Sequence, residues 1–139
     1  MEKYKIGYTT GTYDLFHIGH LNILINAKKS CEYLIVGVST DELVEQYKKK
    51  KPVIPFEERV AIIKSIKYVD KVVVQETQDK VIAWHKYKYD ALFGGSDWSG
   101  SDMINNAEKE LNPKGVDVVL FPYTNTTSST LLREVLLKF

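Results

Sequence analysis

The chain is organised around residues 9–20, which read TTGTYDLFHIGH. This stretch follows a predicted strand over residues 5–8 and leads directly into a predicted helix over residues 21–29. The first turn of a helix presents free N–H groups and the positive end of the helix dipole, which attract phosphate. Gly11 and Gly19 lack a Cβ, so the backbone can approach a ligand closely. His17 and His20 share one face if the turn is helical, so the stretch predicts a phosphate site with two imidazole donors.

A metal site, or a pair of incidental surface histidines, would also account for the two imidazoles. The chain has one further histidine, His85, and a single cysteine, Cys31. A complete His/Cys ligand set is therefore not available, and we predict no metal-ligating side chains.

Length and composition predict one globular domain over residues 1–139. An apolar share of 44% is ordinary for such a domain, and a net charge of +1 gives no general attraction to nucleic acid or to a membrane. A single cysteine excludes an intrachain disulfide and fits a reducing compartment. No signal peptide is visible, and no apolar stretch approaches the ~18 residues of a membrane span. We therefore expect a cytoplasmic protein without a nucleic-acid partner or a membrane span.

Hydrophobic patterning predicts strands that alternate with helices. Continuous apolar runs such as residues 33–38 indicate strands covered on both faces, and apolar residues at helical spacing indicate the intervening helices. The order predicts a Rossmann-like α/β fold, an open, mostly parallel five-stranded sheet with helices on both faces. The predicted strands cover residues 5–8, 33–38, 69–74, 90–95 and 116–121, and the helices cover residues 21–29, 56–66, 79–87, 103–111 and 131–138, with a short helix after residues 39–42.

Three chemically rich turns follow predicted strands, at residues 10–20, 94–98 and 123–130. In open parallel sheets, ligands bind at the carboxyl ends of the strands, near the point where the strand order reverses. We therefore expect these turns to converge on one site.

The first stretch resembles the nucleotidyltransferases that carry the HxGH motif. GTYD at residues 11–14 and HIGH at residues 17–20 carry the resemblance. The residues Asp14-Leu15-Phe16 are similar to the cytidylyltransferase branch, and glycerol-3-phosphate cytidylyltransferases are the nearest match. The resemblance implies that His17 and His20 donate to the α- and β-phosphates of CTP, that Asp14 holds the turn, and that Mg²⁺ accompanies the triphosphate. Further nucleotide contacts are implied for Thr10, Gly11, Thr12, Tyr13 and Gly19.

Residues 48–51 are four consecutive lysines, which on their own would form a solvated loop. The cytidylyltransferases that the chain resembles carry a lysine-rich loop at this place, and two of its lysines face the triphosphate or the acceptor phosphate. Counting back from Arg59 favours Lys48 and Lys50 as catalytic lysines, with Lys51 beside them on the acceptor side. Such a cationic loop would neutralise charge as pyrophosphate leaves.

Arg59 and Lys67 are the other predicted acceptor-side residues. Arg59 matches an arginine near the acceptor phosphate of the similar enzymes; without the resemblance it would be half of a surface ion pair. Lys67 begins KYVDKV (67–72), which resembles the RYVDxV segment at the dimer interface of those enzymes. Lysine keeps the charge there but lacks the planar fork of arginine. The resemblance implies a homodimer, whereas the residues alone indicate only a helix-to-strand junction.

Two later stretches resemble nucleotide-binding segments of the same enzymes. GSDW (95–98) resembles GDDW, which implies that Gly95, Asp97 and Trp98 lie beside the base, although Trp98 alone would suggest only packing. YTNTTSST (123–130) resembles RTxGISTT, with tyrosine in place of arginine and Thr126 in place of glycine. Either Arg133, predicted in the first turn of the last helix, replaces the missing charge, or the nucleotide is held more weakly. The contacts implied for this stretch are Tyr123, Thr124, Ser128, Ser129 and Thr130, of which the last three also fit a simple helix cap.

These observations predict an enzyme that joins CTP to a small phosphorylated alcohol and releases pyrophosphate. The resemblance favours glycerol 3-phosphate as the acceptor, which would give CDP-glycerol. Two other interpretations stay open. One is an adenylyltransferase acting on a phosphorylated cofactor precursor, because the HxGH motif alone does not determine which nucleotide is used. The other is a nucleotide-binding module without turnover.

Overall fold

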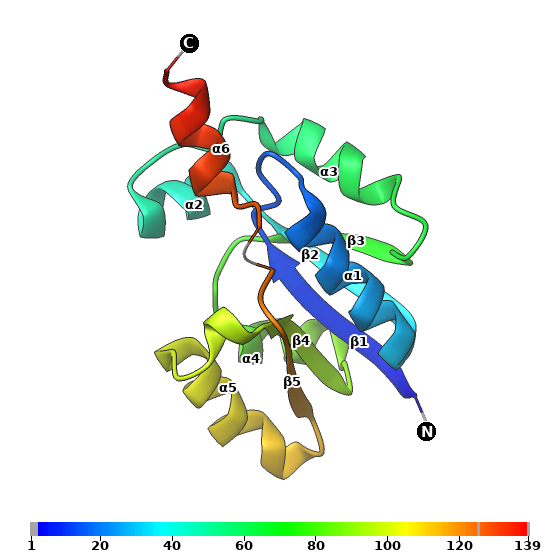
Figure 1. Cartoon of the computed structure of the whole chain (residues 1–139). Helices are drawn as coiled ribbons and strands as arrows, with labels where there is room; N and C mark the ends of the chain where they lie inside the picture. Colours follow the sequence, from blue (N-terminus) through cyan, green and yellow to red (C-terminus); the bar gives the residue numbers. More distant parts are fainter. Residues whose placement is uncertain (1–2, 125, 139) are drawn as a thin grey trace.

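The computed structural model describes residues 3–124 and 126–138, and they form one five-stranded sheet with the strand order β3-β2-β1-β4-β5 (Figure 1). Every neighbouring pair of strands is parallel. The strands are β1 (Tyr4–Gly11), β2 (Cys31–Ser39), β3 (Lys71–Gln75), β4 (Ala91–Gly95) and β5 (Asp117–Phe121). The chain runs outward from β1 in one direction to β3 and then in the other to β5, so the strand order reverses beside β1.

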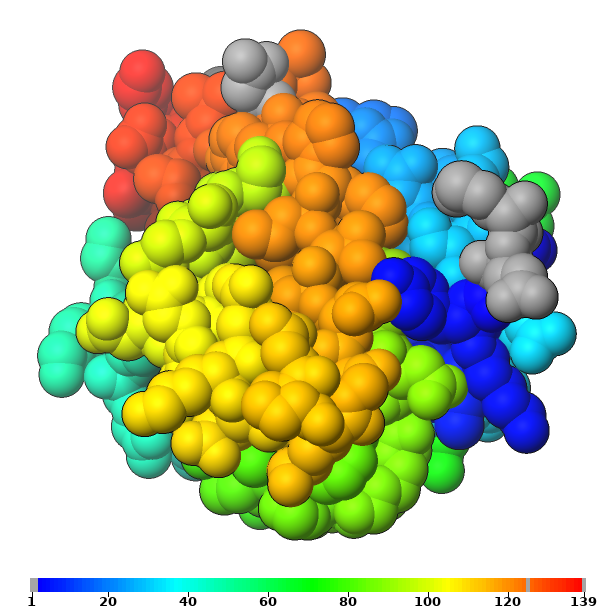
Figure 2. Space-filling model, turned by 90° about the horizontal axis from the view of Figure 1, so that it is seen from below, coloured from blue at the N-terminus to red at the C-terminus, as the bar shows by residue number. Residues whose placement is uncertain are grey.

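Helices connect the strands and cover both faces of the sheet. They are α1 (Ile18–Ser30), α2 (Asp41–Lys48), α3 (Phe56–Lys64), α4 (Lys80–Tyr87), α5 (Asp102–Leu111) and α6 (Ser129–Leu136), with 3-10 turns at Ser96–Trp98 and Asn112–Lys114. Figure 2 shows one side of the molecule, where α5 (yellow) lies beside the segment that passes through β5 (orange). No helix of the described residues is long and apolar enough to cross a membrane.

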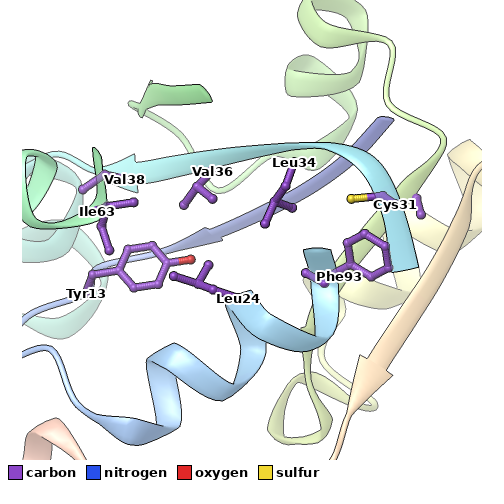
Figure 3. Close-up of a cluster of buried hydrophobic side chains, with 10 residues drawn as sticks. Tyr13, Leu24, Cys31, Leu34, Val36, Val38, Ile63 and Phe93 are labelled. Atoms are coloured by element: carbon purple, nitrogen blue, oxygen red, sulfur yellow. The ribbon is translucent and has the colours of Figure 1, made fainter. Parts of the chain in front are cut away.

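The pleat of β2 divides the core into two clusters. Leu34 and Val36 point towards α1 and α3, where they join Leu24, Phe93 and the ring of Tyr13 (Figure 3). The intervening Ile35 points to the opposite face, into a cluster that contains the buried face of α5, Leu92 of β4 and the rings of Tyr8 and Tyr89. A strand with apolar side chains on both faces explains the continuous apolar run of residues 33–38.

The predicted Rossmann-like fold is confirmed, and the sheet is entirely parallel where the sequence predicted a mostly parallel one. Two helices begin two or three residues earlier than predicted. α1 begins at Ile18 because the side chain of His17 caps it, and α6 begins at Ser129 because Ser128 accepts a hydrogen bond from the N–H of Leu131. Arg133 therefore lies in the second turn of α6, and the prediction that it lies in the first turn is wrong.

Candidate active site

The carboxyl ends of β1 and β4 open into a cavity of about 960 Å³. Its walls also include the start of α1, the end of α2 and the segment that leads into α6. This is the point at which the strand order reverses, where parallel sheets bind ligands. The cavity brings together every residue predicted to be catalytic or to bind nucleotide: Thr10, Gly11, Thr12, Tyr13, His17, Gly19, His20, Lys48, Lys50, Gly95, Asp97, Trp98, Tyr123, Thr124, Ser128, Ser129 and Thr130.

The two histidines form a capping box at the start of α1, with ring centroids 3.9 Å apart. Nδ1 of His17 accepts a hydrogen bond from the N–H of Gly19 at 3.0 Å, and Nδ1 of His20 accepts one from the N–H of His17 at 3.2 Å. Because both Nδ1 atoms act as acceptors, the proton of each neutral imidazole is on Nε2. The cap therefore fixes two N–H donors in one tautomer.

The surroundings of both imidazoles favour the neutral form. Burial lowers the pKa of His17, and burial together with the neighbouring His17 and Lys48 lowers the pKa of His20 to about 3. Desolvation disfavours the charged ring, which is the usual cause of such a shift. The pair can thus donate hydrogen bonds to phosphate oxygens without having to take up a proton.

Asp14 holds the turn, as the sequence predicted. Its carboxylate is buried and accepts hydrogen bonds from the N–H groups of Val53 and Ile54, each at 2.8 Å. Nη2 of Arg133 donates to the same carboxylate at 2.8 Å. One side chain therefore joins the turn after β1 to the segment after the four lysines and to α6.

Tyr13 and Leu15 both have left-handed backbone conformations in this turn. Their φ angles are 55° and 51°, and such angles are costly for bulky residues. The buried ring packs in the core beneath Gly11, where an added Cβ would lie 2.8 Å from it (Figure 3). Tyr13 therefore borders the cavity while its ring anchors the turn.

Arg59 lies outside the cavity and is completely buried. Its guanidinium donates to the carbonyls of Ile54, Thr12 and Ser39 at 2.7–2.9 Å and pairs with the carboxylate of Asp41. A guanidinium committed to these partners connects the β1 turn, the end of β2 and the loop before α3. We therefore replace the predicted acceptor-binding role of Arg59 with a structural one.

The other two predicted acceptor-side residues also lie away from the cavity. Lys51 is exposed and does not line it, in contrast to Lys48 and Lys50. Lys67 is exposed in the connection between α3 and β3, with its amino group 5.2 Å from the ring centroid of Tyr68. Neither lysine is among the residues that line the cavity.

The wall predicted to face the base is formed by the end of β4 and the turn after it. A Cβ added to Gly94 would lie 2.2 Å from the ring of Trp98, so the indole packs directly against the glycine backbone. The hydroxyl of Ser96 accepts a hydrogen bond from the N–H of Tyr123 at 3.0 Å, which connects this turn to the segment before α6. The side chain of Tyr123 is itself exposed.

The start of α6 is attached to the rest of the site by side chains. The hydroxyl of Ser129 donates to the carbonyl of Asp14 at 2.6 Å, and the amide of Asn22 donates to the hydroxyl of Thr124 at 3.0 Å. Arg133 lines the cavity through its pairing with Asp14. The guanidinium thus places a cation on the cavity wall, which was one of the two alternatives that the sequence left open.

Lys80 is a residue of the site region that the sequence analysis missed. It is buried at the start of α4, where burial lowers the pKa of its amino group to about 7. The amino group donates to Oε1 of Gln75 at 3.0 Å and lies 5.6 Å from the ring centroid of Trp98. Gln75 in turn donates to the hydroxyl of Ser39 at 2.8 Å, and both residues line the cavity. The one signal in the sequence was a cation in the first turn of a predicted helix, where the dipole disfavours it.

Comparisons with known proteins agree with this geometry. Residues 8–135 match the family model described as cytidylyltransferase-like. The chain is 34% identical to a glycerol-3-phosphate cytidylyltransferase of Staphylococcus aureus, over 92% of each chain. It is 35% identical to one of Bacillus subtilis, over 91% of this chain and 92% of that protein.

A solved structure of similar fold is the lipopolysaccharide core biosynthesis protein from Thermoplasma volcanium, with a TM-score of 0.71 and 22% identity. The match covers 89% of this chain and 99% of that one, and at this identity it supports the fold alone. The family model and the two cytidylyltransferases span nearly the whole chain, including the cavity residues. The chain therefore belongs to the cytidylyltransferase-like family.

Proposed function

We propose that this chain is a glycerol-3-phosphate cytidylyltransferase, which joins CTP to glycerol 3-phosphate and yields CDP-glycerol and pyrophosphate. The observation that carries the proposal is the convergence of all predicted catalytic and nucleotide-binding residues on one cavity. Relatives of that name, 34–36% identical over most of the chain, support both the reaction and the substrates.

The acceptor phosphate attacks the α-phosphorus of CTP, and the bond to the leaving pyrophosphate breaks. No covalent enzyme intermediate is needed, so catalysis depends on positioning and on stabilisation of charge. The Nε2–H groups of His17 and His20 donate to the α- and β-phosphates. Lys48, Lys50 and Arg133 supply positive charge around the triphosphate. Ser129 and Thr130, at the start of α6, line the same cavity, and a helix start is a place where phosphate can bind.

Mg²⁺ is the cofactor that we propose, bound to the triphosphate. The described residues contain no group of three or more histidine, cysteine, aspartate or glutamate side chains placed to hold a metal ion. This donor set fits Mg²⁺ that is held by phosphate oxygens and waters, which is its common mode in nucleotide enzymes. The ion would lower the negative charge that Lys48, Lys50 and Arg133 must balance.

A homodimer and a cytoplasmic location complete the proposal. Residues 67–72 lead into β3, which forms an edge of the sheet and exposes Val74. An edge strand with apolar side chains is a surface that a second copy can cover. A buried thiol on Cys31 fits the reducing conditions of the cytoplasm.

Pyrophosphate release from purified protein tests the function directly. We expect turnover with CTP and glycerol 3-phosphate, and much less with ATP, or with phosphocholine as the acceptor. A preference for ATP would support the adenylyltransferase interpretation, which the curated relatives favour less. No turnover with any pair of substrates would support the binding module.

A further inference from the structure

Both ends of the lysine segment (residues 48–51) are attached to the turn that follows β1. After the segment, the N–H groups of Val53 and Ile54 donate to the carboxylate of Asp14 at 2.8 Å. Immediately before it, the hydroxyls of Tyr47 and Thr12 share a hydrogen bond of 2.8 Å. The segment therefore crosses the rim of the cavity between two anchors that belong to the same turn.

The two anchors differ in strength. The carboxylate of Asp14 is 3% exposed and bears a charge, and buried charge-assisted hydrogen bonds are the strong ones. Tyr47 is 41% exposed, and its bond to Thr12 joins two neutral hydroxyls. The anchor before the lysines is thus the weaker of the two, and it depends on a single hydroxyl of Tyr47.

Tyr47 is also the anchor nearer to Lys48, the first of the two lysines that line the cavity. The amino group of Lys48 lies 5.8 Å from the ring centroid of Tyr47, and all three of Thr12, Tyr47 and Lys48 line the cavity. Lys49 then ends α2 with a left-handed φ of 61°, which reverses the chain and brings Lys50 to the cavity wall. The position of both cations therefore depends on how the last turn of α2 is held.

We propose that Tyr47 is a positioning residue of the nucleotidyl transfer, whose hydroxyl bond to Thr12 holds Lys48 and Lys50 over the phosphates. This inference rests on the proposed function. Charge stabilisation is effective when the charged groups are already in place before the transition state forms. Tyr47 acts through Thr12 and the lysines and performs no chemical step itself.

Replacing Tyr47 by phenylalanine tests the proposal, because it keeps the ring and removes the hydroxyl. We expect kcat to fall about threefold to tenfold, the range of one hydrogen bond, while KM for CTP changes less than about twofold. Tyr33→Phe is the matched control, since it removes another exposed tyrosine hydroxyl far from the cavity and should leave kcat unchanged. In a Thr12→Val background, Tyr47→Phe should cause no further loss.

Trypsin supplies a readout that needs no substrate. Cleavage after residues 48–50 of the ligand-free protein should be severalfold faster in Tyr47→Phe than in the wild type or in Tyr33→Phe; the bond after Lys51 precedes Pro52 and resists trypsin. An unchanged cleavage rate would overturn the proposal, as would a full effect of Tyr47→Phe on kcat in the Thr12→Val background. If the wild type released no pyrophosphate from CTP, the proposed function would fail while the cleavage rates still tested the anchor.

Discussion

Replacing Lys80 by methionine should stabilise the protein at neutral pH. The amino group is buried, and burial lowers its pKa from 10.5 to about 7. Between these values the unfolded chain holds a proton that the folded protein releases, so the free energy of unfolding rises with pH in this range. Methionine has a similar shape and no proton to lose, so the variant avoids this cost.

The size of the effect follows from the two pKa values. One pKa unit corresponds to about 1.4 kcal/mol. The contribution of Lys80 to the free energy of unfolding should therefore increase by about 2 kcal/mol between pH 7 and pH 9. Below pH 7 both states of the chain bind the proton, and the contribution stops changing. The stabilisation by Lys80→Met should accordingly be largest at pH 7 and below, and about 2 kcal/mol smaller at pH 9.

Urea unfolding of wild type and Lys80→Met at both pH values measures the difference. Lys86→Met is the control, since Lys86 is exposed on the same helix. Burial raises the pKa of the Cys31 thiol, but this residue is common to both proteins, so its effect on stability cancels in the comparison; buried tyrosines such as Tyr8 titrate at higher pH. An equal effect of Lys80→Met at pH 7 and pH 9 would refute the depressed pKa. Activity should fall even as stability rises, because Lys80 supports Gln75 at the cavity wall.

The remaining predictions concern the cavity and Arg59. His17→Ala and His20→Ala should each lower kcat by roughly 10²-fold or more, the scale of losing a donor to a developing charge, and folded variants with near-normal turnover would contradict the mechanism. Lys48→Ala combined with Lys50→Ala should impair catalysis and lower the free energy of unfolding by less than about 1 kcal/mol. Lys51→Ala should change neither the activity nor the stability. Arg59→Met should cost about 3–5 kcal/mol in urea unfolding because it leaves buried carbonyls and a carboxylate without their partner, and Lys67→Met should change neither stability nor KM.

The strand-turn-helix at residues 9–20 was predictable because its signals are local. Glycines, a predicted helix start and two histidines three residues apart all act within one turn of chain. The exact start of α1 was not predictable in the same way. Histidine is not among the usual cap residues, and only the structure shows that His17 takes this role.

Arg59 and Lys80 were misassigned or missed because burial is a long-range property. The carbonyls of Thr12 and Ser39 that hold Arg59 lie 47 and 20 residues away in the chain. Nothing beside Arg59 in the sequence distinguishes a buried structural cation from one that binds an acceptor. Lys80 likewise becomes a buried cation only when Gln75 and Trp98 enclose it.

Two departures from the motifs of similar enzymes turn out to be neighbours. Ser96 stands where those motifs have aspartate, Tyr123 stands where they have arginine, and the N–H of Tyr123 donates to the hydroxyl of Ser96 at 3.0 Å. The pair of sites thus loses one carboxylate and one guanidinium together, which leaves the local charge balanced. A guanidinium nevertheless lines the cavity, because Arg133 reaches it from the second turn of α6 and is held there by Asp14. The cavity wall therefore holds a guanidinium from α6 although position 123 does not supply one.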